Sequence, residues 1–200
     1  ILAVANLKNE GLVGKILVTG CLSQRYQQQL TEELPEVDGV MGTGSYSRIV
    51  EALRALADGE TPRYFDSINE PVEELERVLT TPRYYAFLRI AEGCNNFCAF
   101  CAIPLIRGRY RSRSIEDIRQ EVEALVAKGV REIVLIAQDT TNYGHDIYGE
   151  PSLARLLKEL CRIEGIKWLR TLYSYPKFFT DELIEVIASE EKLVKYVDIP

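Results

Sequence analysis

The stretch YYAFLRIAEGCNNFCAFC, residues 84–101, joins a mainly apolar run to a cluster of three cysteines. The apolar part has the length and composition of a buried strand, and Cys94, Cys98 and Cys101 follow it directly. In α/β folds, the loops after the strands carry the residues that bind and react. The spacing C-x-x-x-C-x-x-C therefore predicts a functional loop at the end of a strand.

Three further apolar runs follow this loop, at residues 132–139, 167–176 and 195–200. Helical patterns separate the runs, and the clearest covers residues 114–128, with Ser114 as its N-cap. Strands and helices that alternate in this way predict an α/β fold, either part of a parallel (β/α) barrel or a doubly wound sheet.

A smaller α/β domain is predicted before the larger one. Apolar runs at residues 14–20 and 37–42 are each followed by a helical pattern, which indicates a second parallel sheet. Prolines and an acidic stretch then interrupt the pattern. We assign residues 1–60 to the smaller domain, 61–82 to a linker and 83–200 to the larger domain.

The composition limits the classes of function. The chain has 200 residues, is 46% hydrophobic and has a formal net charge of -6, which is typical of a folded protein without a global attraction for nucleic acid. Its apolar runs are shorter than the roughly 18 residues of a membrane helix, and its first residues do not resemble a signal peptide. We therefore expect a cytoplasmic location and no membrane partner. Five cysteines with this clustering favour metal binding over a disulfide framework.

The clustered thiols allow more than one kind of site. Thiolates this close repel one another unless a metal neutralises them, and cysteine ligands suit an iron–sulfur cluster or zinc. Structural zinc takes four ligands, whereas Cys21, His145 and Cys161 are all remote in sequence from the cluster. We expect His145 to be solvated and Cys161 to be a core residue. Residue chemistry alone leaves a cluster, a zinc site and inert thiols open.

The cysteine spacing, with Phe100 before the last cysteine, resembles the signature of radical S-adenosylmethionine (SAM) enzymes. The resemblance implies that Cys94, Cys98 and Cys101 hold a 4Fe-4S cluster whose fourth iron binds SAM. It also implies that residues 83–200 form the first part of a radical SAM (β/α) barrel. Enzymes of this kind use an external one-electron reductant and abstract hydrogen from unactivated carbon.

Longer segments resemble the methylthiotransferases, which insert a sulfur and a methyl group into a C–H bond. These segments are GCLSQRY, EGCNNFCAFCAIPLIRGRYRSRSIEDI, GVREIVLIAQDTTNYG and the terminal VDIP. The segment AQDTTNYG is similar to the branch that modifies the β-carbon of an aspartate in small-subunit ribosomal protein twelve. The alternative branch acts on an adenosine of transfer RNA, so nucleic acid is a partner only in that case. A non-enzymatic alternative is a zinc-stabilised binding module.

The segment GCLSQRY implies a second metal site. By resemblance, Cys21 is a ligand of an auxiliary 4Fe-4S cluster, and residues 1–60 are the C-terminal part of the domain that holds it. The other two auxiliary cysteines are expected upstream, and the last barrel strands and a substrate-binding domain downstream. We therefore interpret the chain as an internal fragment that completes at most one cluster site.

Contacts to the cofactor are expected at the carboxyl ends of the predicted strands. Gln138 and Asp139 end the second strand of the larger domain, and Ser174 has the same relation to the third. Gln138, Ser174 and, by its place in the signature, Phe100 are the candidate SAM-binding residues. The polar residues could instead cap helices. The sequence assigns no catalytic residue.

Alternating arginines follow the cysteine cluster, at Arg107, Arg109, Arg111 and Arg113. A strand would place all four on one face. The functional interpretation is contact with an acidic partner or with the carboxylate of the cofactor, and the alternative is a solvated edge.

Overall fold

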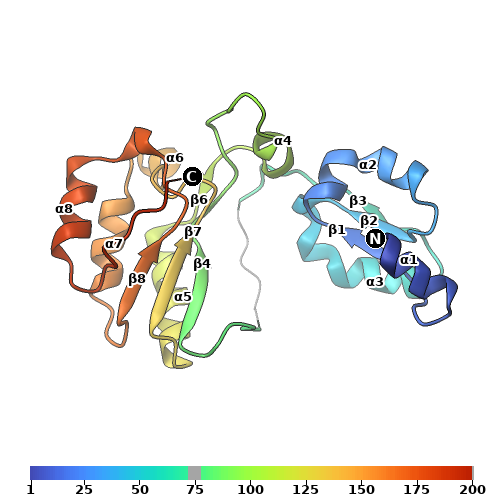
Figure 1. Cartoon of the computed structure of the whole chain (residues 1–200), viewed down its shortest axis with the longest axis horizontal. Coiled ribbons are helices and arrows are strands. Elements are labelled where there is room, and N and C mark those ends of the chain that lie inside the picture. The colour runs from blue at the N-terminus through green and yellow to red at the C-terminus, as the bar shows by residue number, and fades with distance from the viewer. Residues whose placement is uncertain (72–77, 200) are drawn as a thin grey trace. The chain divides into compact units, whose positions relative to one another are not determined.

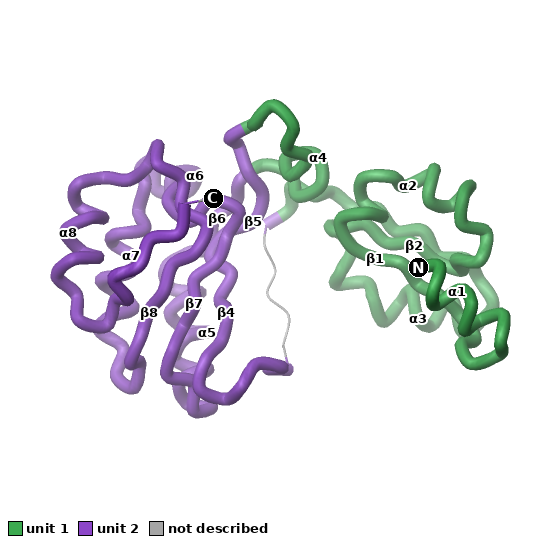
Figure 2. Tube along the Cα trace, viewed as in Figure 1, with its two compact units in different colours: residues 1–70, 97–109 green, residues 71–96, 110–200 purple. Residues whose placement is uncertain are grey.

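The computed structural model describes residues 1–71 and 78–199 (Figure 1). The chain divides into two compact units (Figure 2). The first comprises Ile1–Glu70 with Phe97–Arg109, and the second comprises Pro71–Asn96 with Tyr110–Pro200. The segment that contains the second and third clustered cysteines therefore belongs to the first unit.

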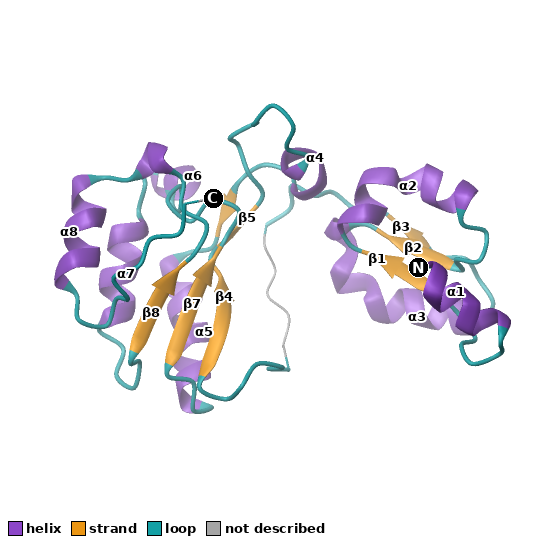
Figure 3. Ribbon diagram, viewed as in Figure 1, coloured by secondary structure: helices purple, strands orange, loops and turns teal. Residues whose placement is uncertain are grey.

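The first unit contains a parallel sheet in the order β1-β2-β3 (Figure 3). Its strands are β1 (Leu17–Thr19), β2 (Gly39–Met41) and β3 (Arg63–Tyr64). Its helices are α1 (Leu2–Asn9), α2 (Cys21–Glu33), the 3-10 helix η1 (Thr43–Arg48), α3 (Ile49–Ala57) and α4 (Ile103–Arg107). A small core of apolar residues lies among these elements: Ala5, Ile16, Leu30, Val37 and Val40. The predicted parallel sheet is confirmed, and β3 adds a strand from within residues 61–82, where the sequence predicts a linker.

The second unit contains a parallel sheet in the order β4-β7-β8 and a short antiparallel pair. Its strands are β4 (Tyr85–Arg89), β5 (Ala91–Glu92), β6 (Arg111–Ser112), β7 (Glu132–Ile136) and β8 (Trp168–Thr171). Its helices are α5 (Ile115–Ala127), α6 (His145–Tyr148), α7 (Leu153–Cys161), the 3-10 helix η2 (Pro176–Phe178) and α8 (Asp181–Ser189). Helix α5 connects β4 to β7, and α7 connects β7 to β8, so this is a parallel α/β arrangement as predicted.

Helix α5 forms where its sequence signals place it. The Ser114 side chain accepts a hydrogen bond from the backbone N–H of Asp117, which caps the first turn. The face that carries Ile118 and Val122 is fully buried. Beyond the helix, Gly129 has a φ of 97°, the left-handed conformation that ends helices.

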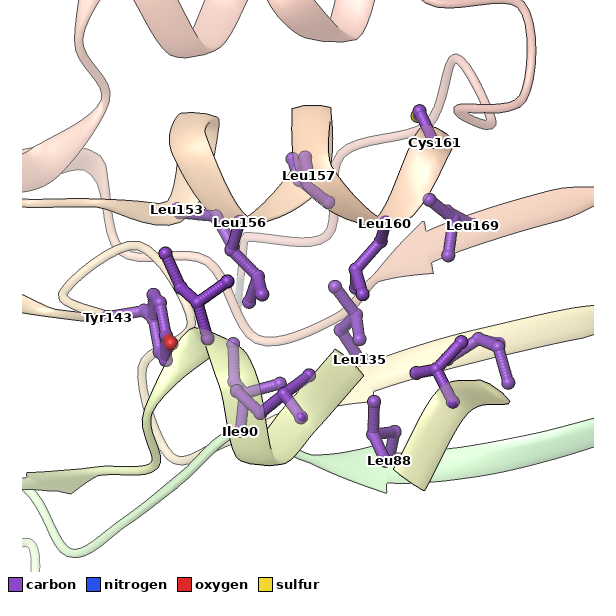
Figure 4. Close-up of a cluster of buried hydrophobic side chains, with 14 of the residues drawn as sticks. Leu88, Ile90, Leu135, Tyr143, Leu153, Leu156, Leu157, Leu160, Cys161 and Leu169 are labelled. Carbon is purple, nitrogen blue, oxygen red and sulfur yellow. The ribbon is translucent and has the colours of Figure 1, made fainter. Parts of the chain in front are cut away.

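The core of the second unit lies between the sheet and its helices. Figure 4 shows Leu88, Leu135 and Leu169, each from a strand of the parallel sheet, in one buried cluster with leucines of α7. The leucines of α7 in this cluster are Leu153, Leu156, Leu157 and Leu160. Cys161 is also buried, with 9% of its surface exposed, which confirms its prediction as a core residue.

The prediction of a fourth strand in the larger domain, at residues 195–200, is wrong for residues 195–199, which the structure describes. Residues 195–199 are not a strand, and the pairing with β8 is limited to a single bridge between Leu169 and Leu193. The backbone N–H of Tyr196 donates to the carbonyl of Val194 across 2.8 Å, so the chain turns where a strand would continue.

Candidate functional site

The cysteine loop begins directly after β5. Gly93 has a φ of 81°, a conformation that favours glycine, and Cys94 follows it. Cys94 is half-buried and its sulfur accepts a hydrogen bond from the backbone N–H of Asn96 across 3.5 Å, whereas Cys98 and Cys101 are exposed. The backbone N–H of Cys101 donates to the carbonyl of Cys98 across 3.0 Å. The last two thiols therefore lie at the ends of one turn.

The donor set fits an iron–sulfur cluster better than a structural zinc ion. Within residues 1–71 and 78–199, no group of three or more histidine, cysteine or acidic side chains is already assembled as a metal site. The loop supplies three cysteine sulfurs as ligands. Three thiolates suit an iron–sulfur cluster in which one iron has an open coordination position. Cys161, a possible fourth ligand for zinc, is buried in the core.

Two asparagines hold the first half of the loop. Asn95 Oδ1 accepts a hydrogen bond from the backbone N–H of Tyr110 across 3.1 Å. Asn96 Nδ2 donates to Asp139 Oδ2 across 3.0 Å. The hydroxyl of Tyr110 in turn donates to the Asp139 carbonyl across 2.7 Å. Burial raises the pKa of Tyr110 well above its ordinary value, so this hydroxyl keeps the proton that it donates.

Asp139 is the centre of this arrangement. Its exposed fraction is 1%, and its Oδ1 accepts from Thr141 Oγ1 at 2.6 Å and from the Asn142 backbone N–H at 3.3 Å. A buried carboxylate requires such donors. Asp139 therefore fixes both the loop after β7 and Asn96, two residues after Cys94.

The candidate SAM-binding residues occupy different environments. The Oε1 atom of Gln138 is buried and has no hydrogen-bond partner among the described residues. Ser174 is 3% exposed, and its backbone N–H donates to the Asp198 carbonyl across 2.8 Å. Phe100 is 97% exposed and belongs to the first unit, whereas the other two belong to the second. The unpartnered acceptor of Gln138 fits a site that a bound molecule completes.

Cys21 is the first residue of α2 and is exposed. It follows Gly20, whose φ of 117° favours glycine at the turn between β1 and the helix. Arg107 Nη2 donates a hydrogen bond to Cys21 Sγ across 3.2 Å. The thiol therefore lies beside a guanidinium within the first unit.

The arginines do not lie on one strand, so that prediction is wrong. Arg107 ends α4, Arg109 follows Gly108 in an irregular segment, and Arg111 lies in β6. A helix that begins with Pro104 in its first turn and ends at left-handed Gly108 replaces the expected strand.

Arg113 also contradicts the alternative of a solvated edge. Its side chain is 2% exposed and forms ion pairs of 2.7 Å with Asp117 and with Glu121. Its Nη1 also donates to the Arg89 carbonyl across 2.8 Å. Arg113 therefore links α5 to β4.

His145 is exposed, as predicted, but it begins the short helix α6 and its ring lies 5.6 Å from that of Phe178. No role was predicted for Asn95, Asn96 or Tyr110, which anchor the cysteine loop. The one available signal was the pair of polar residues between the first two cysteines. Their partners are remote in sequence and become evident only in the fold.

None of the described helices combines the length and the apolar character that a span across a bilayer requires.

The radical SAM superfamily model matches residues 88–200, which include the cysteine loop, the end of β4 and the whole of β7 and β8. The chain belongs to the radical SAM superfamily. Membership of this superfamily implies a 4Fe-4S cluster and SAM.

Curated relatives place the chain near one group of enzymes. It is 53% identical over 186 residues to the ribosomal protein uS12 methylthiotransferase RimO of Thermoanaerobacter sp. (strain X514), covering 92% of this chain and 43% of the relative. It is 53% identical over 202 residues to RimO of Clostridium tetani, covering 100% of this chain and 45% of the relative. The chain thus spans somewhat less than half the length of these relatives.

The solved structures support the fold. The radical SAM methyltransferase TsrM from Kitasatospora setae, with tryptophan and a SAM analogue bound, superposes with a TM-score of 0.62 at 16% identity, covering 90% of this chain and 40% of TsrM. A second TsrM structure, with cobalamin and a [4Fe-4S] cluster bound, gives a TM-score of 0.61 at 16% identity and covers 90% of this chain and 41% of TsrM.

Proposed function

We propose that the full-length protein is a radical SAM methylthiotransferase that modifies the β-carbon of an aspartate in small-subunit ribosomal protein twelve. The observation that carries this proposal is the 53% identity with RimO across the whole of the chain, including the cysteine loop. A ribosomal substrate makes the cytoplasm the expected location.

Cys94, Cys98 and Cys101 would hold the radical 4Fe-4S cluster, and three protein ligands leave one iron open for SAM. Together the cluster and SAM supply a one-electron route to a carbon radical that can remove hydrogen from an unactivated C–H bond. This route suits an aspartate β-carbon, because the neighbouring carboxylate acidifies that C–H bond too little for ordinary base catalysis. The electron comes from an external reductant.

The surrounding residues would position this chemistry. Asn95 and Asn96 fix the first half of the cysteine loop through Tyr110 and Asp139. Gln138 would accept a hydrogen bond from SAM, because its buried Oε1 has no partner within the described residues. Ser174 and Phe100 remain proposed cofactor contacts by their places after β8 and in the cysteine signature.

Cys21 would be a ligand of the auxiliary 4Fe-4S cluster, which we associate with sulfur insertion. A single cysteine cannot hold a cluster, so this assignment requires further ligands from the full-length protein. The thiol is exposed and accepts a hydrogen bond from Arg107, an environment that suits a negatively charged ligand.

The charge distribution favours a protein substrate over transfer RNA. The chain has a net charge of -6, and binding to a nucleic acid backbone usually needs an extended basic surface. Arg113, the last of the clustered arginines, is buried in ion pairs with Asp117 and Glu121. It therefore adds nothing to such a surface.

The direct test offers both substrates to the full-length protein after anaerobic reconstitution, with SAM and a reductant. We expect the methylthio group on the ribosomal aspartate and none on transfer RNA. Modification of transfer RNA alone would assign the chain to the other branch. Metal analysis tests the zinc alternative, because each cluster site must contain about four iron and four sulfide ions, whereas a zinc site contains neither.

A further inference from the structure

Tyr173 has a backbone conformation that is unusual for its residue type. It lies just after the end of β8, and its φ of 61° is in the left-handed region. Glycine enters this region without a steric cost, whereas a bulky side chain does not. Strain of this kind persists only where the surrounding structure imposes it, and it is concentrated at functional sites such as ligand clamps. The conformation of Tyr173 therefore directs attention to what its side chain binds.

Hydrogen bonds to two other segments impose this conformation. The backbone N–H of Tyr173 donates to Asp198 Oδ2 across 2.9 Å, and the backbone N–H of Ser174 donates to the Asp198 carbonyl across 2.8 Å. The carbonyl of Tyr173 accepts from the backbone N–H of Thr140 across 2.9 Å and from Thr140 Oγ1 across 3.2 Å. The backbone of Tyr173 is thus fixed on both sides, whereas the residue as a whole remains 47% exposed.

Tyr173 belongs to the edge of the sheet where the proposed SAM contacts lie. Strands β7 and β8 are parallel neighbours, so the loops that follow them begin at the same edge. Thr140, which bonds to Tyr173, lies shortly after Gln138 on the loop that follows β7. The buried Oε1 of Gln138 has no partner among the described residues. An acceptor without a donor and an exposed aromatic residue on neighbouring loops suit a ligand that has both hydrogen-bond donors and a flat ring.

SAM has both of these features, because its adenine base is flat and its amino groups are hydrogen-bond donors. Aromatic side chains stack on bases because every base has a π face. The carboxylate of the proposed substrate aspartate, in contrast, only accepts hydrogen bonds, so it does not complement the Gln138 acceptor. The observations therefore favour SAM over the substrate aspartate as the ligand of this edge.

We propose that Tyr173 is a SAM-binding residue, and that its left-handed backbone holds its ring in position to stack on the adenine base. This inference rests on the proposed function, in which Gln138 also contacts SAM. It assigns a role to the residue immediately before Ser174, which was the candidate predicted for the loop after β8.

The test measures the dissociation constant of SAM by calorimetry, in the full-length protein after anaerobic reconstitution. Tyr173→Ala removes the ring, and we expect the dissociation constant to rise about tenfold. Tyr173→Phe keeps the ring, and we expect a dissociation constant within about twofold of the wild-type value. The matched control is Tyr84→Ala, because Tyr84 is 60% exposed and directly precedes β4, at the opposite edge of the same sheet. We expect no change in SAM affinity for this control.

A second measurement tests the backbone strain in the absence of SAM. Tyr173→Gly and Tyr173→Ala both lack the ring, but only glycine adopts a φ of 61° at no steric cost. We therefore expect Tyr173→Gly to unfold at a higher urea concentration than Tyr173→Ala, the reverse of their usual order in helices and strands. Both variants should bind SAM with the same weakened affinity. The usual order of stability would overturn the proposal, because the backbone would then not be held in the left-handed region.

A wild-type dissociation constant for SAM in Tyr173→Ala overturns the proposal. If Tyr173→Ala does not fold, Tyr173→Gly is measured in its place, and a wild-type dissociation constant there overturns the proposal equally. Unchanged SAM affinity combined with weaker binding of ribosomal protein twelve would overturn it by assigning the ring to the substrate. The proposed function fails separately: a wild-type protein that binds SAM but leaves the ribosomal aspartate unmodified contradicts that function and not the role of Tyr173.

Discussion

The side chain of Asn96 donates a hydrogen bond to Asp139 Oδ2 across 3.0 Å, and this bond joins the cysteine loop to the residues that follow β7. Strands β4 and β7 are parallel neighbours, so their carboxyl ends lie at the same edge of the sheet. A buried carboxylate at that edge can therefore orient a loop that carries a proposed cluster ligand, Cys94.

Asp139→Ala should destabilise the protein and weaken retention of the radical cluster. The change leaves the side-chain donor of Asn96 and the backbone N–H of Asn142 without the acceptor that Asp139 provides, which costs about 1–3 kcal/mol when such groups are buried. Urea denaturation and the iron content after reconstitution check both effects. The matched control is Asp181→Ala, an exposed aspartate in the first turn of α8, which should change stability by less than about 0.5 kcal/mol. Equal behaviour of the two variants would contradict the role of Asp139.

Cys98→Ala should abolish both cluster loading at the radical site and cleavage of SAM in the full-length protein. Two remaining thiolates cannot retain a cluster with one open iron. Iron analysis and detection of 5'-deoxyadenosine measure the two losses. Cys161→Ala removes a thiol from the core instead and should leave both properties at the wild-type level. Normal iron and normal cleavage in Cys98→Ala would refute the assignment.

Gln138→Met should have opposite effects on stability and on SAM binding. Its buried Oε1 has no partner among the described residues, so an apolar replacement should stabilise the SAM-free protein by about 1 kcal/mol. The same change removes a proposed acceptor and should raise the dissociation constant of SAM about tenfold. Calorimetry measures both quantities, with Gln120→Met as the control, because Gln120 is exposed on α5. Unchanged SAM affinity in Gln138→Met would exclude the contact.

Cys161 should make stability depend on pH in the alkaline range. Burial raises the pKa of this thiol from its ordinary value of 9.0 to about 11. Between these values the unfolded chain loses the proton while the folded chain keeps it, so stability is complete below pH 9 and falls as pH rises toward 11. Denaturation at several pH values compares the stability of the wild type with that of Cys161→Ala. The difference between the two stabilities removes the contribution of the other titrating groups. Parallel stability curves for the two proteins across this range would contradict the prediction.

Local signals were sufficient to predict much of the fold. Ser114 was the N-cap of the helix predicted at residues 114–128, which the structure has as α5, and the alternation of apolar runs with helical patterns predicted both parallel sheets. The order of apolar run and cysteines also predicted that the cysteine loop follows a strand, which in the structure is β5. In each case the determining residues are neighbours in sequence.

Features that depend on distant partners were not predicted. Strand β3 has only two residues and no apolar alternation, so its place beside β2 depends on tertiary pairing. Arg113 looked like part of a solvated strand, but Asp117 and Glu121 on α5 pair with it after the chain turns. The contact of Arg107 with Cys21 likewise joins two elements that no local pattern connects.

The proposed reaction of the full-length protein is methylthiolation of an aspartate in small-subunit ribosomal protein twelve. Mass spectrometry of that ribosomal protein, from cells with and without the gene, measures the modification itself. We expect the methylthio mass increment on the aspartate to disappear in cells without the gene and to return when the gene is restored. Persistence of the increment, or its loss from transfer RNA instead, would show that the proposed substrate is wrong.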